Sequence, residues 1–122
     1  MPDVEDVGAL EDLPDGGVVG VVAHGYRVAL FRRGPRVYGL WARCPHAGGP
    51  LDEGYVTAAG DVMCPWHGWR FQVESGLPAT RAFQHGTPAE EPVAAFPVEV
   101  VGGRVQVGPP PPGIEPPPLL LF

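Results

Sequence analysis

The chain of 122 residues contains 18 Gly and 17 Pro, a composition that excludes an ordinary helical bundle and favours short strands joined by turns. Its formal net charge of −6 comes without any run of basic residues, so we expect no nucleic-acid partner. No stretch approaches the roughly 20 apolar residues of a membrane span, and the acidic opening segment does not resemble a signal peptide. We therefore expect a cytoplasmic protein without a membrane anchor.

The first part of the chain is typical of a three-stranded meander. Short runs rich in Val, Tyr, Leu and Phe occupy Val18–Ala23, Tyr26–Arg32 and Arg36–Ala42, and turns containing Gly or Pro separate them. Asp3–Val7 can add an edge strand before the meander. This pattern predicts the antiparallel sheet of a single domain.

From Arg43 to Phe71 the pattern changes, because Gly, Pro, Cys and His dominate the segment. Only Tyr55–Val56 and Val62–Met63 have strand character within it. A loop of this length inside a compact domain is unusual unless something other than a hydrophobic core organises it. Bound metal can organise such a segment.

Strand character returns in the last part of the domain. Arg70–Val73 is a predicted strand, and residues 75–92 are irregular, with three prolines and no periodicity. Ala94–Val101 and Arg104–Val107 are predicted to form a hairpin around a Gly102–Gly103 turn.

Residues 109–122, PPPPGIEPPPLLLF, form a Pro-rich tail that should be extended, because proline cannot lie inside a helix or a central strand. The tail is either mobile or docked. An exposed Leu119–Phe122 would form an apolar patch, which favours docking on the body or on a neighbouring subunit and so allows a homo-oligomer. We expect one domain over residues 1–108, with its metal-binding part at about residues 43–72.

Four side chains stand out as candidate metal ligands: Cys44, His46, Cys64 and His67. They include both cysteines of the chain and two of its four histidines. A reducing compartment argues against a Cys44–Cys64 disulfide. Structural zinc usually takes Cys-x(2–4)-Cys or His-x(3–5)-His pairs, so a Cys-x-His box suits a single tetrahedral ion poorly. Two irons bridged by sulfides are larger, and each box could then supply one ligand to each iron.

The segments CPHAGGPLDEG and CPWHGWRFQVESG resemble the Rieske [2Fe–2S] signature, Cys-x-His-x-Gly and Cys-x-x-His-Gly, over residues 44–76. In that class two histidines replace two cysteines on one of the two irons. The resemblance implies one [2Fe–2S] cluster, with both cysteines on the inner iron and both histidines on the outer iron. It also implies an all-β fold: an antiparallel β-sandwich or barrel base with a small cluster-binding subdomain of two loops.

The residues expected to surround the cluster are small, stiff or aromatic: Gly48, Gly49, Pro65, Trp66, Gly68 and Trp69. The glycines would let backbone amides approach the cluster sulfurs, and the proline would stiffen its loop. The tryptophans, together with Phe71, could shield one side of the cluster from water. For Phe71 we prefer plain core packing.

The resemblance further implies a low reduction potential. High-potential members of the family carry an extra cysteine in each box, joined as a disulfide, and Ser and Tyr hydroxyls that hydrogen-bond the cluster sulfurs. The corresponding positions here hold Gly49, Trp66, Trp69 and Phe71. Fewer donors to sulfur stabilise the reduced cluster less, so we expect a potential near the low end of the class, at about −150 mV.

These features predict a soluble one-electron carrier, not an enzyme, that passes electrons from a reductase to an oxygenase-type enzyme. One alternative is a small Rieske subunit of a larger reductase such as nitrite reductase. Another is a metal-stabilised binding module without a redox role. The two remaining histidines, His24 and His85, are expected at turns or on the surface. The length leaves no room for a separate catalytic domain, so we do not expect a complete oxygenase.

Overall fold

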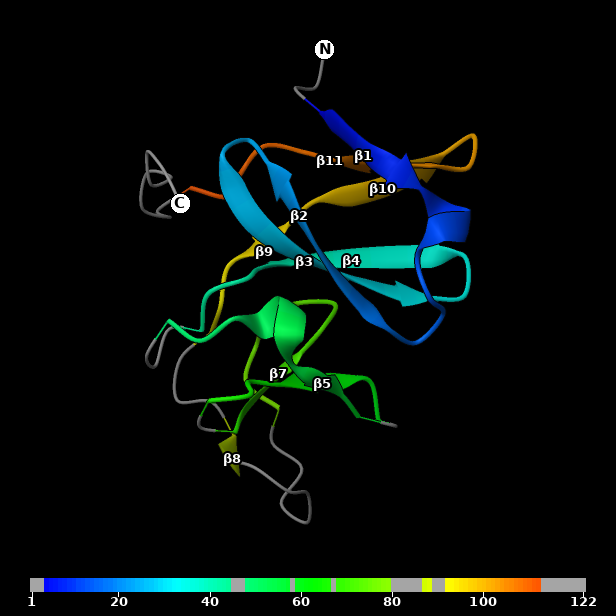
Figure 1. Ribbon diagram of the computed structural model, residues 1–122. Helices are drawn as coiled ribbons and strands as arrows, with labels where there is room; N and C mark the ends of the chain where they lie inside the picture. Colours follow the sequence, from blue (N-terminus) through cyan, green and yellow to red (C-terminus); the bar gives the residue numbers. More distant parts are fainter. Residues whose placement is uncertain are drawn as a thin grey trace.

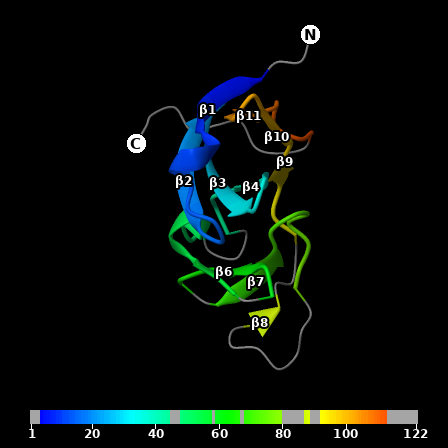
Figure 2. The same ribbon diagram turned by 90° about the vertical axis from the view of Figure 1, so that its right-hand side faces the viewer.

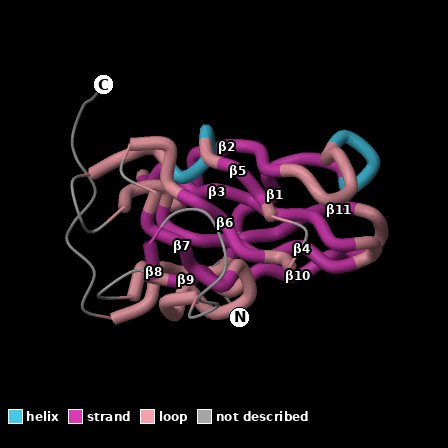
Figure 3. The backbone as a smooth tube through the Cα atoms, turned by 90° about the horizontal axis from the view of Figure 1, so that it is seen from below, coloured by secondary structure: helices cyan, strands magenta, loops and turns pink. Residues whose placement is uncertain are grey.

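The computed structural model describes residues 4–44, 48–57, 59–66, 68–79, 87–88 and 92–112. Strands dominate this part of the chain, accompanied by two single-turn 3-10 helices, η1 (Leu10–Asp12) and η2 (Leu51–Glu53) (Figures 1 and 3). The predicted all-β class is therefore confirmed. Neither of these helical turns is long and apolar enough to cross a membrane.

The first sheet joins the two ends of the domain in the order β1-β11-β10. Its strands are β1 (Glu5–Ala9), β10 (Val98–Val101) and β11 (Arg104–Val107). Gly102 and Gly103 have φ angles of +57° and +77°, which suit the predicted hairpin turn and which glycine adopts without strain. The expected N-terminal edge strand lies slightly further along the chain than predicted and pairs antiparallel with β11.

The second sheet is the predicted meander with one further strand, in the order β2-β3-β4-β9. Its strands are β2 (Val18–Ala23), β3 (Tyr26–Arg33), β4 (Arg36–Trp41) and β9 (Ala95–Phe96). The three strands of the meander pair antiparallel, and each agrees with its predicted bounds to within one residue. The alternation of short apolar runs and Gly-containing turns is thus sufficient to predict the three strands of the meander, though not β9.

The single strand predicted at Ala94–Val101 is wrong. Pro97 divides it into β9, which pairs with β4, and β10, which pairs with β11, so the two halves belong to different sheets. Pro97 has no N–H to donate to a ladder. Its carbonyl accepts the N–H of Gly108 at 2.8 Å, which connects this crossing point to the end of β11.

The third sheet contains the segment rich in Gly, Pro, Cys and His, in the order β5-β6-β7-β8. Its strands are β5 (Tyr55–Val56), β6 (Asp61–Met63), β7 (Trp69–Gln72) and β8 (Thr87–Pro88). Residues 75–92 are irregular in the sequence-based prediction, but Thr87–Pro88 within them forms β8, which runs parallel to β7. Parallel neighbours require a crossover connection, and the segment between Gln72 and Thr87 is long enough to provide one.

The second sheet lies between the other two and is covered on both faces (Figure 2). Side chains alternate between the two faces of a strand. Along β3, Val28 and Leu30 belong to the hydrophobic cluster shared with the first sheet, whereas Ala29 and Phe31 belong to the cluster shared with the third sheet. This double burial explains why β3 has a nearly continuous apolar run.

Candidate metal centre

The loop that begins at the first Cys-x-His box is closed by two backbone hydrogen bonds. The N–H of Cys44 donates to the carbonyl of Gly49 at 2.9 Å, and the N–H of Gly48 donates to the carbonyl of Cys44 at 2.7 Å. Gly48 has a φ of +76°, which residues with a Cβ rarely adopt. These contacts hold Cys44 at the base of a tight loop.

The loop of the second box has the same backbone pattern. The N–H of Cys64 donates to the carbonyl of Trp69 at 2.8 Å, and the N–H of Gly68 donates to the carbonyl of Cys64 at 3.0 Å. Gly68 has a φ of +77°. The two loops are therefore matched in backbone, although the histidine follows the cysteine at different spacings in the two boxes.

Both cysteines are buried in one hydrophobic cluster between the second and third sheets. Cys44 is 1% exposed and Cys64 is 2% exposed. No disulfide joins them, as expected. The two loops approach each other closely: a Cβ atom on Gly49 would lie 2.6 Å from Sγ of Cys64, so only glycine fits there.

The three aromatic residues of the second box have different surroundings. A Cβ atom on Gly49 would lie 3.1 Å from Cγ of Trp66, so the Trp66 ring lies against this glycine while its side chain stays exposed. Trp69 and Phe71 are buried, with ring centroids 6.4 Å apart. Phe71 is a core residue, as preferred from the sequence, and Trp69 joins the same cluster. Trp66 is the one of the three that covers the outside of the paired loops.

Sequence reasoning missed the charged groups near these loops. Arg43 lies over Gly48, where a Cβ atom would be 3.5 Å from Nε of the guanidinium group. Asp61 on β6 and Arg70 on β7 form a buried ion pair, with Oδ2 and Nη1 3.9 Å apart. Nothing in the local sequence pattern distinguishes these charges from surface charges.

The predicted histidine ligands His46 and His67 lie outside the described residues. Among the residues that the structure describes, no group of three or more His, Cys, Asp or Glu side chains comes together to hold a metal ion. The described half of the donor set still permits a test of fit. Two buried thiols on matched loops, with a glycine between them, provide soft sulfur donors suited to iron–sulfur ligation. These residues fit the [2Fe–2S] cluster that the resemblance implies.

The remaining histidines were expected at turns or on the surface. His24 lies in the β2–β3 turn with a φ of +54°, but its side chain is only 10% exposed. Its Nε2 donates to the carbonyl of Val107 at 3.0 Å, and Nδ1 lies 3.4 Å from Oε2 of Glu5. His24 therefore connects the second sheet to the first, and its turn position is confirmed while a surface position is not. His85 lies outside the described residues.

Comparison with known proteins agrees with this geometry. Residues 3–97 match the Rieske [2Fe–2S] domain family. The ferredoxin component of an alkene monooxygenase system from Xanthobacter autotrophicus is 35% identical over 103 residues, which cover 84% of this chain and 79% of that protein.

Solved structures give the same picture. The ferredoxin of carbazole 1,9a-dioxygenase from Nocardioides aromaticivorans has a TM-score of 0.78 at 32% identity, covering 87% of this chain and 97% of that one. A chain from the complex of reduced oxygenase and oxidized ferredoxin in carbazole 1,9a-dioxygenase has a TM-score of 0.75 at 30% identity, covering 88% and 94%.

Proposed function

The chain belongs to the Rieske [2Fe–2S] domain family, and we propose from this membership that it is the ferredoxin component of an oxygenase system. In this role it carries one electron at a time on a [2Fe–2S] cluster and catalyses no reaction of its own. The observation that supports the proposal most directly is the pair of matched loops. They hold two buried thiols in one hydrophobic cluster of a chain whose relatives are ferredoxin components.

We propose Cys44, His46, Cys64 and His67 as the cluster ligands. When bound, the cluster supplies a one-electron carrier whose class covers potentials of roughly −150 to +300 mV. The burial of both cysteines excludes water from the sulfur side of the site. The hydrogen bonds that close each loop hold the two cysteine backbones in place.

The proposed partners follow from the one-electron role. An oxygenase is the acceptor, as in the dioxygenase complex that contains a similar chain. A reductase is the proposed donor. We propose that both partners dock in turn close to the histidine ligands of the cluster, because electron tunnelling requires a short path. The proposal further includes a cytoplasmic location, a single domain over residues 1–108 and a docking role for the Pro-rich tail in a homo-oligomer.

The experiment that tests the proposal is spectroscopic and kinetic. Purified protein should be coloured, contain two irons and two acid-labile sulfides per chain, and show a [2Fe–2S] EPR signal after dithionite reduction. It should accept electrons from a flavin reductase and be reoxidised by an oxygenase. Colourless protein that stays folded without iron would contradict it. Size-exclusion chromatography of cell extract distinguishes a separate carrier from a subunit held in a larger reductase.

A further inference from the structure

The fold closes the two matched loops in different ways. The second loop connects β6 to β7, and these strands pair directly, with Met63 opposite Arg70. The first loop is entered from β4 and left through η2 towards β5. Within the described residues β4 pairs with β3 and β9, and β5 pairs with β6, so no ladder joins the two sides of the first loop. The Cys44–Gly49 hydrogen bond closes the loop itself, and contacts with β3 hold the segments that lead into and out of it.

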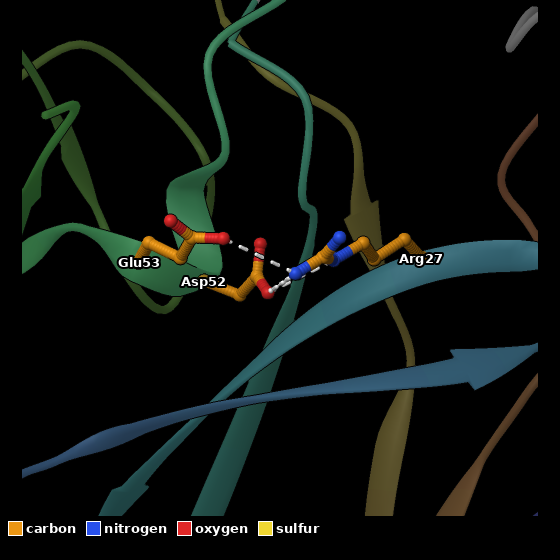
Figure 4. A network of polar contacts seen from close by, with 3 residues as sticks. All are labelled: Arg27, Asp52 and Glu53. Carbon is orange, nitrogen blue, oxygen red and sulfur yellow. Dashed lines mark hydrogen bonds and ion pairs between the residues drawn. The ribbon is translucent and has the colours of Figure 1, made fainter. Parts of the chain in front are cut away.

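Arg27, on β3 of the second sheet, contacts both ends of the first loop. Its backbone carbonyl accepts the N–H of Ala42 at 2.9 Å, where the chain enters the loop. Its guanidinium group donates from Nε and Nη2 to Oδ2 of Asp52, at 2.9 and 2.6 Å, where the chain leaves the loop in η2. Figure 4 shows the Arg27 side chain directed at Asp52, with Glu53 further away at 3.5 Å. One residue of the second sheet thus contacts the chain on both sides of the first loop, at Ala42 and at Asp52.

The side chain of Asp52 is buried. It is 4% exposed, and Oδ1 is buried without a hydrogen-bond partner among the described residues. A Cβ atom on Gly20 of β2 would lie 2.9 Å from Cγ of Asp52 and closer still to Oδ2, so this glycine provides the space for the carboxylate. A buried carboxylate is costly unless a cation pairs with it. Arg27, whose own side chain is 56% exposed, supplies that cation.

Between these two ends the first loop is supported unevenly: Cys44 and Leu51 are buried in one cluster with Phe31 of β3. A groove of about 790 Å³ opens beside it, with Val22 and Arg27 on the side of the base and Arg43, Gly48 and Pro50 on the side of the loop. The loop therefore does not pack continuously against the second sheet. On the side of this groove the loop depends on the contacts at its ends.

We propose that Arg27 and Asp52, with the space left by Gly20, are positioning residues that hold the first cluster-binding loop closed, in place of the strand pairing that closes the second loop. We call this Arg27–Asp52 contact the clamp, and the contacts of the described residues support it. Its effect on the cluster rests on the proposed function. Through this clamp the second sheet would limit the movement of the Cys44 backbone.

The test compares hydrogen exchange in the full-length protein as purified, wild type against Arg27→Met, by mass spectrometry. We expect the amides of Cys44 and Gly48 to exchange faster in the variant, by up to about tenfold, because the buried Asp52 carboxylate loses the half-exposed cation that pairs with it. The amides of Cys64 and Gly68 should keep their protection, because the β6–β7 ladder is intact. Loss of protein-bound iron to a chelator should accelerate by a similar factor.

Further variants keep the test decisive if Arg27→Met does not fold. Gly20→Ala retains both charges but displaces the Asp52 carboxylate, and it should show the same loop-selective exchange. Arg27→Lys, which keeps the charge and loses the two-nitrogen contact, should give an intermediate effect. Arg104→Met is the matched control, because Arg104 also donates from Nε and Nη2 to an aspartate, Asp6, but on the first sheet.

Two results would overturn the proposal: unchanged exchange in the first loop of Gly20→Ala and of a folded Arg27→Met, or an equal loss of protection in both loops. The second result would indicate a general stabilising contact. Protein purified without iron would refute the proposed function, but the exchange comparison would still decide whether the clamp exists.

Discussion

Gly49→Ala should weaken cluster binding, because the new methyl group has no room. It would lie 2.6 Å from Sγ of Cys64 and 3.1 to 3.2 Å from two atoms of the Trp66 ring. Normal contact distances are about 3.5–4.0 Å. Trp66 is 56% exposed and can move away, but Cys64 is 2% exposed and cannot. The second loop must therefore shift at Cys64, which we propose as a cluster ligand.

Overpacking of this kind costs about 1–3 kcal/mol. If that cost falls on the cluster-bound form, it corresponds to a roughly 5- to 150-fold loss in cluster retention. The assay follows visible absorbance and protein-bound iron during incubation with a chelator, for wild type and variant under the same conditions. Gly102→Ala is the control for a glycine replaced far from the loops: it meets no atom within 4 Å, and the strain from its φ of +57° falls on the β10–β11 turn. Wild-type retention and an unchanged EPR signal in Gly49→Ala would refute the reasoning.

Four further predictions can be checked independently. Cys44→Ser should abolish the visible spectrum, and a variant that retains a full iron complement would contradict its assignment as a ligand. Asp61→Asn should lower the free energy of unfolding by up to about 3–5 kcal/mol in denaturant titrations, because Arg70 loses its nearby buried counter-charge. Hydrogen bonds from Arg104 lower the pKa of the exposed Asp6 carboxyl, so the stability they add is present above about pH 4 and lost as the pH falls through the lowered pKa. Melting temperatures of wild type and Arg104→Met should therefore differ at pH 7 and converge in acid. A redox titration should give a potential near about −150 mV, and a value near +300 mV would contradict the argument from missing hydroxyl donors.

The parts of the fold that could be predicted from the sequence are those governed by local chemistry. Alternating apolar runs and turn glycines gave the meander, and Gly102–Gly103 marked the hairpin. Pro97 carries an equally local signal, since proline interrupts a ladder, whereas the apolar pattern alone predicts one strand across it. The equivalence of the two loops was also present in the sequence. Gly48 and Gly68 each lie four positions after their cysteine, but the unequal histidine spacing concealed the match.

The contacts that position the first loop could not be predicted in this way. Arg27 and Asp52 are 25 residues apart in sequence, and nothing in either local pattern connects them. Gly20 interrupts an apolar strand and would be expected only to weaken it. Its role is evident only once the Asp52 carboxylate is seen beside it. Contacts of this kind depend on how the two subdomains are arranged, which a single sequence does not specify.

The Trp66 ring resting on Gly49 also determines how the two loops respond to reductants. A disulfide across the same gap would open and close with the thiol–disulfide balance of its surroundings. An aromatic ring against a glycine has no bond for a reductant to cleave. The contact between Trp66 and Gly49 can therefore persist at strongly reducing potentials and in both oxidation states of the carrier.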